Sequence, residues 1–225
     1  PYIVDLMYGV KRADRGEFSN LYTMVDGLAA RTGISAPALM VSELPIPNAF
    51  AYGSPLTGSR VAVTRGLLRQ LEPEEIEAVI GHEFGHLRHR DVQVMLFVSL
   101  LPSLFYILAR YTLYSSYYSG GGRDAERRGG GLMLISTLSM LVYFVLLLFT
   151  LGLSRLREYY ADQHSVTVVQ EGDRKLSEAL AKISIGTWRT MNRRGGTAFS
   201  GFKTLFISDP DRAGNDAASV SSYLR

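Results

Sequence analysis

Two long stretches without a single charge dominate the hydrophobic pattern of this chain. They cover residues 92–109 and residues 132–153. As a helix, the second stretch is about 33 Å long, enough to cross a hydrocarbon core of roughly 30 Å. The first stretch is shorter, but it approaches that length if Arg110 snorkels and the helix continues to Leu113. The pattern predicts two transmembrane helices, the first kinked at Pro102, a residue that membrane helices tolerate.

The segment between the two stretches, residues 114–131, combines a cluster of tyrosines with two glycine triplets. Tyrosines are typical of the membrane interface, and glycine triplets are typical of flexible connectors. This predicts a transmembrane hairpin whose outer ends, near Asp91 and Ser154, emerge on the same side of the membrane. The alternative, two core helices of a large soluble protein, fits less well because the second stretch lacks a polar stripe. Arginines flank both sides in equal number, so the positive-inside rule does not fix the orientation.

The polar parts on either side of the hairpin predict a small mixed domain. Before it, apolar residues recur at helical spacing in residues 17–32, with Gly33 as a stop. Short apolar runs bounded by Pro and Gly predict strands of a small sheet at residues 38–44, 45–53 and 60–64.

After the hairpin, a polar helix is predicted from Ser154 to about Gln170 and another at Leu176–Ile185. The tail from Arg189 is rich in Gly, Ser and Arg and is assigned little structure. The expected fold class is therefore mainly α with a small β-sheet (α+β). The chain divides into three predicted parts: residues 1–91, the hairpin 92–153 with its connector 114–131, and residues 154–225.

Composition narrows the chemistry that the domain can perform. The 225 residues contain no cysteine, which excludes a disulfide framework, a thiolate metal site and a thiol nucleophile. A formal net charge of +3 without a basic stripe predicts no nucleic-acid partner. Charges at Asp5, Lys11 and Arg12 argue against a signal peptide at the start of the chain.

The chemically informative segment is a helix predicted to begin at Pro73, which carries the pattern H-E-F-G-H at residues 82–86. His82 and His86 are four residues apart, so both imidazoles project from one face and can bind one cation. Two imidazoles on a helix suit Zn²⁺, and Glu83 is placed to hold a water molecule rather than the metal. The alternative reading makes all three ordinary polar residues of a helix surface.

A catalytic zinc ion needs a third protein ligand and an open fourth position. The hairpin returns the chain beside the zinc helix at Ser154, and we therefore predict Glu158 as that ligand. Asp162 lies one turn later on the same face, where it can accept a hydrogen bond from a ligating histidine. Either acid could instead be a surface residue. His89 and His164 lie off the ligand face and are predicted to have structural or solvated roles.

These motifs resemble those of the HtpX-like zinc metalloproteases, relatives of the type I CAAX prenyl proteases. The resemblance rests on H-E-F-G-H-L-R-H-R-D, the hairpin, R-E-Y-Y-A-D at residues 157–162, N-A-F-A at residues 48–51 and V-A-V-T-R-G-L-L at residues 61–68. It implies a zincin-like domain with an inserted hairpin, His82, His86 and Glu158 as zinc ligands, Glu83 as the catalytic base and Asp162 as the acid behind them.

The resemblance also implies how the protein works. Its substrates would be extended protein segments held along Asn48, Ala49, Phe50 and Ala51. It would act as an integral, multi-pass membrane protein with its active site at the membrane surface, on the cytoplasmic side, and would degrade misfolded membrane proteins. Two alternatives stay open: a processing protease for a defined, membrane-associated or prenylated peptide, and a non-catalytic zinc-binding membrane scaffold. The oligomeric state is not predicted.

The chain departs from the family pattern in two places. Such enzymes usually carry a His-Pro pair followed by an Arg, whereas this chain has Asp209-Pro210 and then Arg212, which leaves the oxyanion-stabilising group unassigned. Family members also commonly carry another membrane hairpin before the first helix, so we expect a truncated or processed chain.

Overall fold

A computed structural model describes residues 1–54, 56–118 and 123–194. The chain order of the elements is α1 (Tyr2–Tyr8), β1 (Val10–Arg12), α2 (Ser19–Thr32), β2 (Ala38–Ser42), β3 (Ala49–Ser54), β4 (Gly58–Thr64), α3 (Arg65–Gln70), α4 (Pro73–Arg88), α5 (Asp91–Tyr118), α6 (Arg123–Val168) and α7 (Gly172–Arg194). The expected class, mainly helical with a small sheet, is confirmed. The described residues form two compact units, one from residues 1–89 and 159–194 and the other from Arg90–Glu158.

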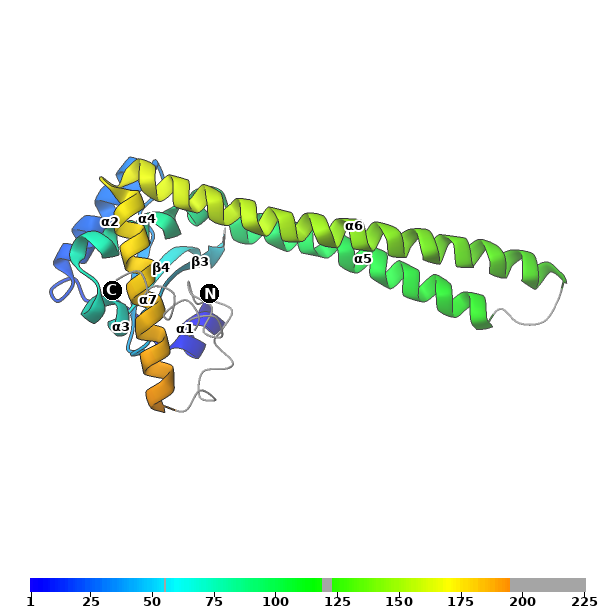
Figure 1. The fold of residues 1–225 in the computed structure, drawn as a ribbon, viewed down its shortest axis with the longest axis horizontal. Coiled ribbons are helices and arrows are strands. Elements are labelled where there is room, and N and C mark those ends of the chain that lie inside the picture. Colours follow the sequence, from blue (N-terminus) through cyan, green and yellow to red (C-terminus); the bar gives the residue numbers. More distant parts are fainter. Residues whose placement is uncertain (55, 119–122, 195–225) are drawn as a thin grey trace, which may run out of the picture. The chain divides into compact units, whose positions relative to one another are not determined.

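The first unit is built around a mixed four-stranded sheet with the order β1-β2-β4-β3. Strands β3 and β4 are labelled in Figure 1. Strands β2 and β4 run parallel, and β1 and β3 are antiparallel to their neighbours. Side chains alternate between the faces, as the period of a strand requires. Leu39, Val61 and Val63 join the helices in the main core, whereas Phe50 and Tyr52 pack with Tyr8 on the other face. Because β3 is last in the strand order, it is an edge strand within the described sheet.

Helix α2 confirms the amphipathic segment read from the sequence, because Val25 and Leu28 are buried in the main core. It ends at Gly33, whose left-handed backbone (φ 73°) lets its N–H reach the carbonyls of Ala29 and Ala30. Two short elements at the N-terminus, α1 and β1, were not predicted. Helix α1 hides little of its apolar side, since Leu6 is 86% exposed and Tyr8 alone is buried.

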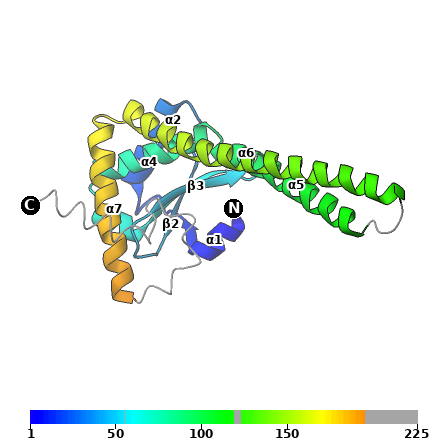
Figure 2. The ribbon, with the colours of Figure 1, turned by 45° about the vertical axis from the view of Figure 1, so that its right-hand side comes forward.

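The second unit consists of α5 and the first part of α6, which lie side by side (Figures 1 and 2). The Ser136 hydroxyl donates to the Ala109 carbonyl at 2.9 Å, and the rings of Tyr106 and Tyr143 are 5.5 Å apart. Two segments are long and apolar enough to cross a membrane, Gln93–Tyr118 and Gly130–Val168. Only 11% of the most apolar window of each is buried, as expected for surfaces that contact lipid.

Three predictions about the helices are wrong. Helix α6 is one continuous helix from Arg123 to Val168, so no separate polar helix begins at Ser154. The connector is shorter than residues 114–131, because α5 continues to Tyr118 and the second glycine triplet lies within α6. Helix α7 reaches Arg194, five residues beyond the point where the tail was expected to begin. Backbone hydrogen bonding within a helix does not depend on side-chain polarity, so a change from apolar to charged residues does not mark a helix end.

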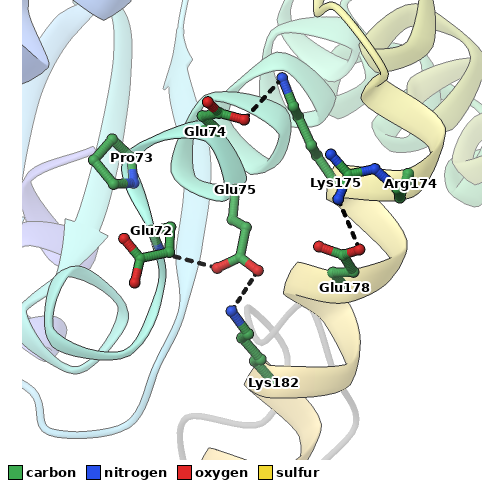
Figure 3. A pocket seen from close by; sticks show the side chains of 8 residues that line it. All are labelled: Glu72, Pro73, Glu74, Glu75, Arg174, Lys175, Glu178 and Lys182. Atoms are coloured by element: carbon green, nitrogen blue, oxygen red, sulfur yellow. Dashed lines mark hydrogen bonds and ion pairs between the residues drawn. The ribbon is translucent and has the colours of Figure 1, made fainter.

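The start of α4 is tied to α7 by ion pairs around a hollow of about 460 Å³ (Figure 3). Glu75, which is only 4% exposed, accepts from the Glu72 backbone N–H at 2.8 Å and lies 2.5 Å from the Lys182 ammonium group. Lys175 pairs with Glu74 at 3.2 Å. These contacts anchor the N-terminal end of α4 and leave its other end for the chemistry described below.

Replacing Lys182 by Gln is expected to destabilise the chain by about 1–2 kcal/mol, because it leaves the buried Glu75 carboxylate without its cation. The expected loss is below that of a fully buried pair, since the Lys182 side chain is 43% exposed. Thermal unfolding in detergent measures it. Arg174→Gln is the matched control, because its partners Glu171 and Glu178 are exposed and its loss should stay below about 1 kcal/mol. Equal losses in the two variants would contradict this account.

Candidate metal centre

Helix α4 carries two histidines that converge on one point. Its first turn is fixed by Pro73 and by a capping box in which the Glu72 and Glu75 side chains bond to each other's backbone N–H. The Nε2 atoms of His82 and His86 lie 3.2 Å apart. Two ligands about 2.0–2.1 Å from a tetrahedral ion are separated by about 3.3 Å, so this spacing fits zinc.

Asp162 stands behind the first of these histidines. Its Oδ1 lies 2.9 Å from Nδ1 of His82, while Nε2 of the same ring faces His86. A carboxylate on the outer nitrogen selects the tautomer that leaves Nε2 free to bind a metal and fixes the plane of the ring. His82 is 8% exposed, so the surrounding protein also restricts its ring.

The end of α6 reaches α4 through a close helix contact at Gly85. A Cβ placed on Gly85 would lie 2.8 Å from the Ala161 Cα, closer than such atoms approach. One turn along α6, the Ser165 hydroxyl donates to the Ala78 carbonyl at 2.8 Å. The glycine inside the H-E-F-G-H pattern thus allows the backbones to approach closely enough for Asp162 to contact His82.

Glu158 precedes Asp162 by one helical turn and therefore lies on the same face of α6. It is the last residue of the second unit and is joined by one peptide bond to the part of α6 that packs on α4. Ligand atoms of His82, His86 and Glu158 all lie within 4.8 Å of one another. The donor set of two imidazoles and one carboxylate is typical of a catalytic zinc site.

Glu83, the proposed base, is 6% exposed and points toward the edge of the sheet. Its Oε2 accepts a hydrogen bond from the backbone N–H of Ala51 at 2.8 Å. This N–H faces away from β4, which pairs with the opposite edge of β3. Sequence reasoning missed the contact, because no residue pattern marks which backbone group of an edge strand will meet a side chain.

The four residues assigned to substrate binding lie in or beside β3, but they are not equivalent. Asn48 and Ala49 are completely buried, and the Asn48 backbone bonds to Thr64 of β4. Phe50 packs with Tyr8 on the face of the sheet that does not meet α4. Ala51 is partly exposed at the edge. Substrate contact by these residues stays a prediction, and the accessible part is the backbone edge at Ala51.

The other two histidines lie away from the converging nitrogens. His164 is buried, and its Nε2 lies 3.1 Å from the Thr32 hydroxyl of α2. Nδ1 of His89 lies 2.9 Å from the Gly85 carbonyl. The contact of His164 is of the structural kind that the sequence suggested for it, and its role stays a prediction. Asp209, Pro210 and Arg212 lie outside the described residues.

Comparison with known families matches most of the chain. Residues 16–214 match the model of peptidase family M48. The chain belongs to this family. It is 40% identical over 223 residues to a protein named "Protease HtpX homolog" from Thermoplasma acidophilum. This alignment covers 96% of this chain and 68% of that protein. It is 44% identical over 183 residues to a homologue of the same name from Aeropyrum pernix, covering 81% of this chain and 57% of that protein.

A solved structure shares the fold of this chain. The crystal structure of S. mikatae Ste24p matches with a TM-score of 0.57 at 20% identity, covering 97% of this chain and 53% of that one. This likeness concerns the fold. The chain thus spans between about half and two thirds of the relatives it matches. The family resemblance read from the sequence is confirmed, and the relatives together with the two apolar helices indicate a membrane protein.

Replacing Asp162 by Asn is expected to weaken zinc binding by about 10-fold, because the His82 ring loses the carboxylate behind it. Competition with a chromophoric chelator measures the affinity for zinc. Asp173→Asn, at an exposed position in the first turn of α7, is the matched control and should bind zinc like the parent chain. Unchanged affinity in the Asp162 variant would remove that residue from the metal centre.

Proposed function

We propose that this chain is the catalytic part of a membrane-anchored, zinc-dependent endopeptidase. His82, His86 and Glu158 would hold the metal, and Glu83 would be the general base. The observation that carries the proposal is the convergence of the two imidazole nitrogens at 3.2 Å, with Asp162 behind His82 and the Glu158 carboxylate within reach. Membership of peptidase family M48 supports the same reaction.

The mechanism assigns a separate task to each side chain. A bound zinc ion would lower the pKa of water and polarise the scissile carbonyl. Glu83 takes a proton from the attacking water, which forms a bond to the carbonyl carbon, and delivers that proton to the nitrogen of the leaving amine as the C–N bond breaks. Its low exposure keeps bulk water away from the carboxylate, and the Ala51 N–H orients it before substrate arrives.

The substrate would lie in extended form along the edge of β3 that does not pair with β4, beside the Ala51 N–H that Glu83 occupies. Main-chain hydrogen bonds supply affinity in this kind of recognition, whatever the side chains are. The small side chain of Ala51, which is partly exposed at that edge, offers little selectivity, which suits segments of unfolded chains. We therefore infer that the protein degrades damaged or misfolded membrane proteins, from an active site at the cytoplasmic surface of the membrane.

The two alternatives make different predictions. A processing protease would cleave one defined or prenylated peptide and leave unfolded casein intact. The likeness to Ste24p concerns the fold alone and does not favour this alternative. A zinc-binding scaffold would bind the metal without hydrolysing peptide bonds, yet the chain retains the glutamate that hydrolysis requires.

The proposal is tested on the purified chain in detergent by zinc quantification and casein hydrolysis. We expect about one zinc ion per chain, loss of hydrolysis after chelation, and recovery when zinc is restored. Glu158→Ala should lower both zinc content and hydrolysis, because two imidazoles alone bind the metal weakly. Glu178→Ala, at an exposed position on α7, is the control. Hydrolysis that survives chelation would contradict the proposal.

A further inference from the structure

Three charged residues form a chain of ion pairs where α5 begins, and the proposed third metal ligand is one of them. They are Asp91 at the start of α5, Arg157 near the end of the second unit, and Glu158, the proposed ligand. Oδ2 of Asp91 lies 3.5 Å from Nε of Arg157, and Nη2 of Arg157 lies 3.2 Å from Oε1 of Glu158. All three residues belong to the same compact unit.

The exposure of the three side chains increases from Asp91 through Arg157 to Glu158. The Asp91 side chain is 9% exposed, Arg157 is 30% exposed and Glu158 is 52% exposed. A buried carboxylate requires a cationic or hydrogen-bonding partner, and the Arg157 guanidinium supplies the positive charge next to Asp91. The planar guanidinium is then pre-oriented, and its remaining nitrogens point in fixed directions.

The contact between Arg157 and Glu158 is not a usual helix pair. Adjacent residues on an α-helix project about 100° apart and do not face each other. Here Nη2 of Arg157 meets the carboxylate of Glu158 while Nε of the same guanidinium lies near Asp91. The hydrogen bond engages Oε1 of Glu158. An exposed glutamate gains a preferred orientation in this way.

We propose that Arg157, anchored by Asp91, is a positioning residue that orients the Glu158 carboxylate for metal binding. The inference rests on the proposed role of Glu158 as third ligand. It assigns a task to an arginine that touches neither the metal nor the substrate. Partners of this kind typically change metal affinity by 10–100-fold, and we expect about 10-fold for Arg157.

The test is a double-mutant cycle on zinc affinity, measured with the full chain in detergent by competition between Zn²⁺ and a chromophoric chelator. Arg157→Gln should weaken zinc binding about 10-fold in the parent chain and should have no effect in the Glu158→Ala background. A merely structural role would weaken binding equally in both backgrounds. Arg155→Gln is the matched control, because Arg155 is exposed on the same helix and none of the described residues pairs with it.

Two further variants keep the test decisive if Arg157→Gln folds poorly. Asp91→Asn should lower zinc affinity in the same direction, because the guanidinium loses its anchor. Arg157→Lys should retain part of the zinc affinity that Arg157→Gln loses, since lysine keeps the positive charge but lacks the planar guanidinium group. Equal affinities of Arg157→Gln and the parent chain, with weaker binding by Glu158→Ala, would overturn this inference and leave the proposed function intact. Unchanged affinity in Glu158→Ala would instead overturn the ligand assignment.

Discussion

Replacing Glu83 by Gln is expected to lower peptide hydrolysis by 10²–10⁴-fold while zinc content stays at the level of the parent chain. The amide has nearly the shape of the carboxylate and can still accept the hydrogen bond from the Ala51 N–H. It cannot take a proton from water. The loss should therefore appear in kcat, measured by casein hydrolysis, with thermal unfolding unchanged.

A matched control for this variant lies on the same helix. Glu77→Gln also removes one negative charge from α4, but Glu77 pairs with Arg31 on α2 and takes no part in the metal centre. It should hydrolyse casein like the parent chain. Normal turnover by Glu83→Gln would remove that residue from the mechanism, whereas a loss of zinc would assign it to metal binding instead.

Replacing Gly85 by Ala is expected to destabilise the chain by about 1–3 kcal/mol and to weaken zinc binding. The added methyl group would lie 2.8 Å from the Ala161 Cα, and backbone on that side cannot rotate away as a side chain can. The end of α6 must shift, and Asp162 shifts with it away from His82. Thermal unfolding and chelator competition measure the two effects.

Gly27→Ala provides the comparison, because Gly27 lies on the exposed side of α2 with no atom within 4 Å of an added Cβ. It should stabilise the chain by up to about 1 kcal/mol, the usual gain from Ala over Gly within a helix. If the Gly85→Ala chain unfolds at the same temperature as the parent and binds zinc equally well, α4 and α6 can move apart without loss of stability, which would contradict this prediction.

The sequence predicted those parts of the protein that depend on periodicity. The spacing of His82 and His86 on a helix, the apolar stretches and the amphipathic α2 follow from the period of an α-helix and from bilayer thickness. Glu158 was predicted because a hairpin returns the chain to the side from which it left, and its role as a metal ligand stays a prediction. The resemblance to a known family added Asn48–Ala51 and the cytoplasmic location, which stay predictions.

The contacts that the sequence could not supply depend on the relative position of distant segments. The bond from the Ala51 N–H to Glu83 requires the register of β3 against α4, which no local pattern specifies. The pairing of Asp91 with Arg157 depends on how far α6 is shifted along α5. The helix boundaries around residues 114–131 failed for a simpler reason, since glycine lowers helix stability without forbidding a helix that has other support.

The first compact unit is assembled from two separate segments, one before and one after the hairpin. During synthesis, the zinc helix leaves the ribosome well before the segment that carries Glu158 and Asp162. The nascent chain thus holds His82, Glu83 and His86 without Glu158 and Asp162 until both apolar helices have been made. Under the proposed function, hydrolysis would require both segments and would begin only after the apolar segments are available for insertion.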